Sequence, residues 1–290
     1  MHAVKTKRRI NLSAVVAVIL FALLFLAGMI SRNAGEKHKE TPPEQDGPAV
    51  ETAPLTEEEA EPENRQEEWQ LPLRPVDPDK PMVALTFDDG PSGEYSPLIL
   101  DCLEKNNAVA TFFEIGCNVA NYPEIDKRAV ELGCEIGSHS YYHNVLPGQS
   151  QEDIAEDQRL CKEVFENAIG TDPVLIRPPQ GSVVKSILNQ YDQIFVGWSV
   201  DTEDWLYKNV DRTVNKVQQA GNLDGQVILM HSIYQESAQA AEILVPWLIE
   251  QGYQLVTVSE LFYYHYGITP EKHYYYAYDY FISDGALMLS

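Results

Sequence analysis

From residue 81 onward the chain alternates short apolar runs with amphipathic stretches, and this alternation constrains the fold more than any other feature. The apolar runs predict strands at 83–87, 110–114, 135–137, 174–176, 193–197, 227–230 and 254–257. The amphipathic stretches between them predict helices at 96–105, 119–132, 151–169, 183–190, 210–220 and 238–251. Strands that alternate with helices favour a parallel sheet, either open or closed into a barrel. Seven short strands are fewer than a complete eightfold barrel needs, so we predict an α/β fold with a distorted or incomplete (β/α) barrel.

Charged and titratable residues gather where these predicted strands end. In barrels and open α/β sheets, the loops after the carboxyl ends of the strands carry the chemistry. The residues at these positions are Asp88, Asp89, His139, His143, Arg177, Asp201, Asp204 and His231. One polar residue in a loop means little, but five strand ends that carry such groups indicate a functional site.

The adjacent acids Asp88 and Asp89 fall where the first predicted strand becomes a loop, because Gly90 and Pro91 stop the strand. Side chains alternate between the faces of a strand, so both acids can point the same way only if the strand has already broken. Two carboxylates in unlike surroundings can take unlike roles, one binding a cation and one accepting a proton. The alternative interpretation is an ordinary Asp-Asp-Gly-Pro turn.

His139 and His143 follow the predicted strand 135–137 and lie four residues apart. On a turn of helix they would face the same way and could chelate one ion. An aspartate from the first loop would complete a set of two histidines and one carboxylate, which leaves metal positions open for water and substrate. The alternative is a pair of surface histidines without a ligand.

Five segments in order resemble the motifs of the polysaccharide deacetylase family, which is carbohydrate esterase family 4, or the nodulation-protein-B homology domain. They are Thr86-Phe87-Asp88-Asp89-Gly90-Pro91, Ser138-His139-Ser140-Tyr141-Tyr142-His143, Arg177-Pro178-Pro179-Gln180-Gly181, Asp201-Thr202-Glu203-Asp204-Trp205 and Val227-Ile228-Leu229-Met230-His231. The resemblance covers residues 81 to 262, approximately. Each motif alone is modestly specific, whereas five in this order are highly specific.

The resemblance implies a metal-dependent site. Asp88 would be the general base that activates a water, and Arg177 would hold Asp88 as an anion. Asp89, His139 and His143 would bind a divalent ion, zinc first, with cobalt, nickel or manganese as alternatives. Such an ion would assist hydrolysis because an amide resists attack by water at neutral pH.

The resemblance also implies an acid and a substrate pocket. His231 would be the general acid that protonates the leaving amine, and Asp204 would orient it, because an amine leaves poorly unless protonated. Gln180 would help polarise the acetyl carbonyl, and Trp205 and Leu229 would line the acetyl pocket. Gln180 stands where the family often has tyrosine, so the resemblance leaves the substrate preference open.

The N-terminal segment predicts export. Residues 12–30 form an uncharged apolar run that, as a helix, would span roughly 28 Å, close to the thickness of a bilayer core. Lys5, Lys7, Arg8 and Arg9 precede it and would stay on the cytoplasmic side. A cleaved signal peptide is the alternative. We expect a single-pass protein of the cell membrane with an extracellular catalytic domain.

These features predict five regions. Residues 1–9 would be a basic cytoplasmic end, 10–30 a transmembrane signal-anchor and 31–78 an acidic disordered linker, because the linker has too few apolar residues to fold. Residues 79–265 would form the catalytic domain. Residues 266–290 would be a tyrosine-rich tail that packs its rings onto the domain.

Charge and cysteine content restrict the partners and the covalent structure. The formal charge of −23 argues against nucleic acid as a partner and favours a neutral or cationic one. The four cysteines allow disulfides outside the cell, but a domain of this size can bury a core without them, so we expect mostly buried thiols.

Three functional hypotheses follow. The first is a metal-dependent N-deacetylase that acts on N-acetylhexosamine units of a cell-envelope polysaccharide, either peptidoglycan or a chitin-like glycan. The second is an O-acetyl esterase on a glycan such as xylan. The third is a glycan-binding module without turnover, which the loss of a metal ligand or of His231 would indicate; neither is lost.

Overall fold

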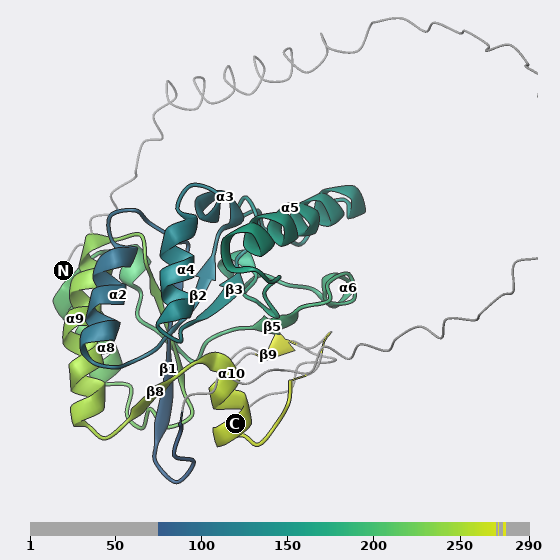
Figure 1. Cartoon of the computed structure of the whole chain (residues 1–290). Coiled ribbons are helices and arrows are strands. Elements are labelled where there is room, and N and C mark those ends of the chain that lie inside the picture. The colour runs from purple at the N-terminus through teal and green to yellow at the C-terminus, as the bar shows by residue number, and fades with distance from the viewer. Residues whose placement is uncertain (1–74, 271, 273–274, 277–290) are drawn as a thin grey trace, which may run out of the picture. The chain divides into compact units, whose positions relative to one another are not determined.

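The computed structural model describes residues 75–270, 272 and 275–276 (Figure 1). The strands are β1 (Met82–Asp88), β2 (Thr111–Glu114), β3 (Glu135–Ser138), β4 (Leu175–Ile176), β5 (Ile194–Val196), β6 (Val200–Asp201), β7 (Val227–His231), β8 (Gln254–Val256) and β9 (Tyr275–Tyr276). The longer helices are α2 (Ser96–Lys105), α4 (Pro123–Glu131), α5 (Gln151–Ile169), α8 (Val210–Gln218) and α9 (Gln235–Glu250). Short turns of helix are α3 (Gly116–Val119), η1 (Pro179–Gly181), α6 (Lys185–Leu188), α7 (Asp204–Tyr207), α10 (Val258–Glu260) and η2 (Leu261–His265).

The strands form one sheet in which every pairing is parallel. The order along the sheet is β6-β7-β1-β2-β3-β4-β5-β9, and β8 pairs with the first half of β1. Helices α2, α4, α8 and α9 lie along the outside of the curled sheet (Figure 1). The predicted parallel α/β fold with an incomplete barrel is therefore confirmed.

Strand β1 organises this sheet because it is buried on both faces and paired on both edges. Val83, Leu85 and Phe87 face the core beneath the helices, whereas Met82 and Ala84 face the core inside the barrel. A strand buried on both faces reads as a continuous apolar run, which explains why β1 was predictable.

The predicted elements differ from the observed ones mainly where the elements are short. All seven predicted strands exist, but the two-residue strands β6 and β9 were missed. The predicted helix 119–132 is wrong as one element, because α3 and α4 are separate. Pro123 begins α4 and keeps Tyr122 outside the helical region, at φ −137° and ψ 50°. The predicted helix 183–190 is only the single turn α6.

The C-terminal segment that was predicted as a tail contributes a strand. Tyr275 and Tyr276 pair with Phe195 and Val196 of β5, and both tyrosines are buried. The ring of Tyr276 lies 5.0 Å from that of Phe262, measured between centroids. The expected packing of tyrosine rings onto the domain is thus observed at these two residues.

The apolar run 12–30 and the linker 31–74 lie outside the described residues, so the predicted anchor remains a prediction. None of the helices between residues 75 and 270 is long and apolar enough to cross a bilayer. All four cysteines are thiols, and three of them are buried, as expected: Cys102, Cys134 and Cys161.

Two acids are buried between the sheet and the helices. Glu114 ends β2 and Asp126 lies in the first turn of α4, and both are almost fully buried. Among the described residues, no hydrogen bond reaches either carboxylate oxygen of Asp126 or Oε2 of Glu114. Burial, with the charge of Glu124 adding to it, raises the pKa of Asp126 to about 8. Burial and the charges of Asp126, Asp88 and Asp89 raise the pKa of Glu114 well above its usual range.

We predict that Asp126 makes the protein less stable as the pH rises. Its pKa is higher in the folded state than in the unfolded chain, so the folded state binds the proton more tightly. The stabilisation is present below about pH 4 and is lost progressively toward about pH 8. Asp126→Asn should therefore flatten the dependence of the unfolding free energy on pH and stabilise the protein at pH 8 by about 1–3 kcal/mol.

Urea unfolding at pH 5 and pH 8 measures this effect. Asp211→Asn is the matched control, because Asp211 is also in the first turn of a helix but is exposed. Equal pH dependence in wild type and Asp126→Asn would contradict the prediction.

Candidate active site

Asp88 lies at the carboxyl end of β1 and is held by a buried arginine. Arg177 Nη1 lies 2.6 Å from Asp88 Oδ1, and both side chains are almost completely buried. The same Nη1 donates to Thr86 Oγ1 at 2.8 Å, and Thr86 in turn donates to the carbonyl of Ile228 at 2.7 Å. This charge-assisted bond fixes one oxygen of Asp88 against a buried cation.

Both terminal nitrogens of Arg177 are hydrogen-bonded, and its guanidinium lies against an aromatic ring. It follows β4, its Nη2 donates to the carbonyl of Gly197 at 2.8 Å, and its Cζ lies 4.0 Å from the centroid of the Phe113 ring. A guanidinium with this many contacts cannot turn away from Asp88 without leaving several buried groups unpaired. The predicted pairing of Arg177 with Asp88 is therefore present in the structure.

Asp89 leaves the strand by adopting a left-handed backbone conformation, with φ 70°. For a residue other than glycine this conformation costs about 1–3 kcal/mol and persists only where the surroundings impose it. The turn brings Asp89 to the same side as Asp88, since Asp89 Oδ1 and Asp88 Oδ2 lie 3.4 and 3.8 Å from His139 Nε2. The strand is thus broken between the two acids, as their expected division of roles requires.

The helical spacing argument for the two histidines is wrong. Residues 139–143 form no helix, and Ser140 and His143 have left-handed backbones with φ 64° and 59°. This irregular loop nevertheless brings the rings together, with centroids 4.9 Å apart. His139 Nδ1 lies 2.7 Å from the carbonyl of Arg177, so Nδ1 carries the hydrogen and Nε2 presents its lone pair to the site.

Asp89, His139 and His143 form a set that could hold a divalent ion. Asp89 Oδ1 lies 3.4 Å from His139 Nε2 and 3.3 Å from His143 Nε2, and one ligand atom from each residue falls within 4.8 Å of the others. These separations suit ligands placed about 2.1 Å from one ion. Asp89 Oδ1 is buried and accepts no hydrogen bond from the described residues, as a metal ligand would be. The predicted convergence of these three residues is confirmed.

The protonation of these residues favours binding of a cation. Burial raises the pKa of Asp89, but its close contact with His139, with the positive charges of His231 and His143, outweighs burial and lowers the pKa. Burial, followed by the charge of His139, lowers the pKa of His143. Both residues are therefore in their ligating forms at neutral pH, the first as a carboxylate and the second as a neutral imidazole.

A second pair, His231 and Asp204, lies next to Asp88. His231 ends β7 directly opposite Asp88, because these two residues are partners in the β1–β7 pairing. His231 Nδ1 lies 2.8 Å from Asp204 Oδ1, and the His231 amide donates to Asp204 Oδ2 at 2.8 Å. Ser237 and the Trp205 amide also donate to Asp204, at 2.5 and 2.9 Å. Asp204 is thus an immobilised acceptor that orients the imidazole.

The surroundings of His231 favour its protonated form. Burial lowers the pKa of His231, but the hydrogen bond and charge of Asp204, with the charges of Asp88 and Asp89, reverse this and raise the pKa above its usual value. His231 can therefore carry a proton near neutral pH, whereas His143 cannot. The site thus contains one histidine that can carry a proton and two that could bind a metal ion, within the same group of carboxylates.

We predict that Asp204→Asn lowers the pKa of His231, because it removes the largest of the effects that raise it. His231 would then lose its proton at a lower pH, and its imidazole resonance in an NMR titration of the metal-free protein would shift at that lower pH. Asp224→Asn is the control, since Asp224 pairs with another histidine, His265. An unchanged titration of His231 in Asp204→Asn would contradict the prediction.

The three predicted substrate-pocket residues are less closely gathered. Leu229 is buried on β7, two residues before His231 and on the same face of the strand. Trp205 follows Asp204 and is 46% exposed, so its ring is open to a ligand. Gln180 is exposed in η1 and has a left-handed backbone, with φ 59°. Their roles in binding remain predictions.

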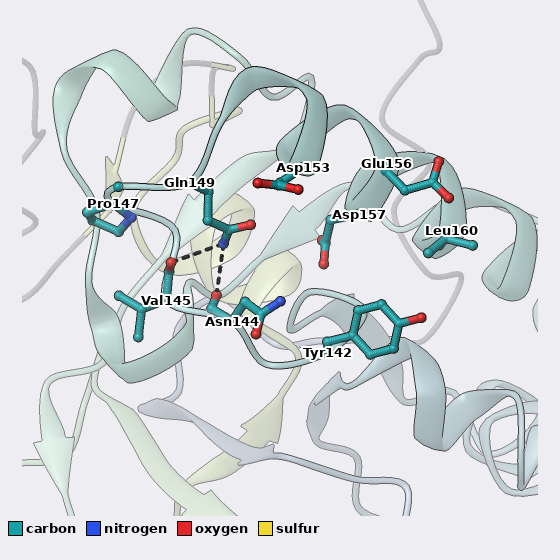
Figure 2. Close-up of a pocket in the computed structure, with 10 residues that line it drawn as sticks. Tyr142, Asn144, Val145, Pro147, Gln149, Asp153, Glu156, Asp157 and Leu160 are labelled. Carbon is teal, nitrogen blue, oxygen red and sulfur yellow. Dashed lines mark hydrogen bonds between the residues drawn. The ribbon is translucent and has the colours of Figure 1, made fainter. Parts of the chain in front are cut away.

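A pocket of about 560 Å³ lies beside the histidine loop (Figure 2). Tyr142 and Asn144, which flank His143 in the chain, line one side, and α5 lines the other. Its carboxylates have partners within the protein: Asp153 accepts from Ser150, Glu156 pairs with Arg159, and Asp157 accepts from the amide of Tyr141. The pocket is therefore not a second set of metal ligands, and its exposed Tyr142 ring is its most accessible feature.

Sequence reasoning missed two residues that support the site. Thr86 was visible in the first motif but had no predicted role, although it links Arg177 to β7. Ser237 lies in the first turn of α9 and donates to Asp204, and no pattern in the sequence signals this contact.

An open parallel barrel with two histidines, a carboxylate and a separate acid–base pair at its strand ends defines a candidate hydrolytic centre. Residues 76–195 match the family model described as polysaccharide deacetylase. The structure is similar to that of peptidoglycan deacetylase PdaC from Bacillus subtilis, with a TM-score of 0.63 and 40% identity, covering 65% of this chain and 93% of that one. The chain belongs to the polysaccharide deacetylase family.

The relatives differ in the substrates that their names give. Peptidoglycan-N-acetylglucosamine deacetylase PgdA of Listeria monocytogenes is 39% identical over 180 residues, which are 62% of this chain and 38% of that protein. PdaC, described as a peptidoglycan-N-acetylmuramic acid deacetylase, is 41% identical over 187 residues, or 64% of this chain and 40% of that protein. The chain thus spans about two fifths of these relatives. A family 4 acetyl xylan esterase from Clostridium thermocellum, solved with a cobalt ion, has a TM-score of 0.59 and 34% identity over 62% of this chain and 90% of that one.

Proposed function

We propose that the protein is a metal-dependent hydrolase that removes N-acetyl groups from N-acetylhexosamine units of a cell-envelope polysaccharide, with peptidoglycan as the first candidate. One observation carries the proposal: Asp88 lies between the Asp89–His139–His143 set and His231 and is paired with the buried Arg177. A base, a cation site and an acid therefore meet at one end of the barrel. The names of the relatives support an amide substrate.

The residues divide the reaction between them. A divalent ion, zinc first, would supply Lewis acidity and lower the pKa of a bound water. Asp88 accepts the proton of the attacking water, because Arg177 keeps its carboxylate ionised and correctly aimed. His231 donates a proton to the departing nitrogen, because Asp204 fixes its ring and favours its protonated form.

The substrate would be oriented by residues around this centre. Leu229 and Trp205 would line the pocket for the acetyl methyl group, and Gln180 would help to polarise the acetyl carbonyl. The exposed ring of Tyr142, at the pocket beside His143, offers a stacking surface for a neighbouring sugar.

O-acetyl ester hydrolysis is the alternative that the comparisons support, because the Clostridium thermocellum relative is named as an acetyl xylan esterase. The same base and cation site would serve an ester. An alcohol leaves more easily than an amine, so an esterase would depend less on protonation by His231. A binding module without turnover is the weakest hypothesis, because no ligand or acid–base residue is missing.

Acetate release by the full-length protein from peptidoglycan, chitooligosaccharides and acetylated xylan tests the proposal. We expect release from an N-acetylated glycan that depends on added zinc and is abolished by a chelator. Release from acetylated xylan alone would establish the esterase, and release from none of the three with metal bound would contradict both activities.

Substitution of the two adjacent acids tests their division of roles. Asp88→Asn should keep the ion but lower turnover by about 10²–10⁴-fold, the usual contribution of a positioned base. Asp89→Asn should weaken metal binding, so that added zinc restores part of the activity. Arg177→Ala should resemble Asp88→Asn more weakly and move the acid limb of the pH–rate profile upward.

Metal content by mass spectrometry, measured beside acetate release, distinguishes these variants. An Asp88→Asn protein that is metal-free and is rescued by zinc would show that the two roles are reversed.

We also propose that the protein is a single-pass protein of the cell membrane with its catalytic domain outside. The support is the uncharged run 12–30 and the basic residues before it. Protease added to intact cells should remove the domain and leave the N-terminal segment in the membrane fraction. Full-length protein that resists protease in intact cells but is degraded after lysis would contradict this orientation.

A further inference from the structure

Residues 115–118 are the N-cap and the first three residues of the helical turn α3, and this 115–118 turn is bonded to both loops that carry the candidate metal ligands. The amide of Ile115 donates to the carbonyl of Gly90 at 2.8 Å, and the side-chain amide of Asn118 donates to the carbonyl of Asp89 at 2.9 Å. The amides of Gly116 and Cys117 each donate at 3.0 Å, to the carbonyls of Ser140 and Tyr141 respectively. Four consecutive residues thus bond to the segment after β1 and to the segment between the two histidines.

These bonds fall where the ligand loops are strained. Asp89, Ser140 and His143 have left-handed backbones, which residues other than glycine adopt only when their surroundings impose it. The carbonyl groups of Asp89 and Ser140, two of these three residues, accept hydrogen bonds from the 115–118 turn. The turn therefore constrains the peptide groups next to two of the strained residues.

Close packing adds to the hydrogen bonds. A Cβ atom on Gly116 would lie 2.6 Å from Cδ2 of Tyr141 and 3.2 Å from its Cα. The turn can approach the histidine loop this closely only with glycine at position 116. Asn118 has a different role, because its bond to Asp89 comes from a side chain and can be removed without changing the backbone of the turn.

We propose that the 115–118 turn fixes the geometry of the metal site, and that Asn118 is the positioning residue for the ligand Asp89. Asn118 holds the Asp89 carbonyl, which restricts rotation of the peptide group and keeps Oδ1 between the two imidazole nitrogens. Without this bond Asp89 can relax toward an ordinary backbone conformation, and the ligand set loses its preorganisation. The inference rests on the metal site of the proposed function, but it concerns the affinity for the ion and not the reaction.

The test is the zinc dissociation constant of the full-length protein, measured by competition with a chromogenic chelator. Residues that orient metal ligands typically change affinity by about 10–100-fold when substituted, and we expect Asn118→Ala to weaken zinc binding by this factor. Asn118→Leu, which keeps the side-chain shape and removes the donor, should have the same effect. Asn121→Ala is the matched control, because Asn121 Nδ2 also donates to a backbone carbonyl at 2.9 Å, that of Cys117, which belongs to neither ligand loop.

Urea unfolding of the metal-free proteins separates positioning from general stability. We expect Asn118→Leu and Asn121→Ala to unfold at similar urea concentrations while only the former loses zinc affinity. Wild-type affinity in both Asn118 variants, or an equal loss in Asn121→Ala, would overturn the inference. A wild-type protein that binds zinc, cobalt, nickel and manganese no better than Asp89→Asn would instead overturn the metal site on which the proposed function rests.

Discussion

The buried ion pair between Arg177 and Asp88 is the interaction on which the rest of the site depends. A buried guanidinium is costly unless its charge is paired, and here Asp88 pairs with the charge while Asp88, Thr86 and the Gly197 carbonyl accept from Nη1 and Nη2; of its nitrogens, only Nε lacks a partner among the described residues. The backbone of Arg177 has a second role, because its carbonyl sets the tautomer of His139. Arg177, which follows β4, therefore fixes both Asp88, the proposed base, and the ring of His139, a proposed metal ligand.

The inward face of β1 explains why this pair is located at one end of the barrel. Met82 and Ala84 face the apolar interior, whereas Thr86 and Asp88, which continue the same face, bind Arg177. The interior thus changes from apolar to polar along a single strand. Because the strands are parallel, their carboxyl ends meet at the polar end, and His231 on β7 becomes the direct neighbour of Asp88.

The sequence predicted what depends on regular pattern and on motif. The seven predicted strands follow from apolar runs, and helices 96–105 and 151–169 were predicted with their observed bounds. The two histidines lie together as predicted, but for a different local reason, because the loop 139–143 uses left-handed residues and not a helical turn. Such conformations are imposed by tertiary hydrogen bonds, as at Asn118 and Asp89, and no local pattern in the sequence reports them. The two-residue strands β6 and β9 were missed because no aliphatic run surrounds them, whereas the equally short β4 lies in the aliphatic run 174–176.

The separation of roles between Asp88 and Asp89 follows from where the strand breaks. Asp88 is the last residue of β1, and its Oδ1 is paired with Arg177. This pairing directs the other oxygen, Oδ2, toward His139. Asp89 turns out of the strand, and its Oδ1 accepts no hydrogen bond from the described residues. A carboxylate that is already paired suits proton transfer, whereas one with an unpaired buried oxygen between two imidazoles suits a cation. The backbone conformation of one residue therefore gives two chemically identical neighbours the unlike surroundings that the proposed base and the proposed ligand need.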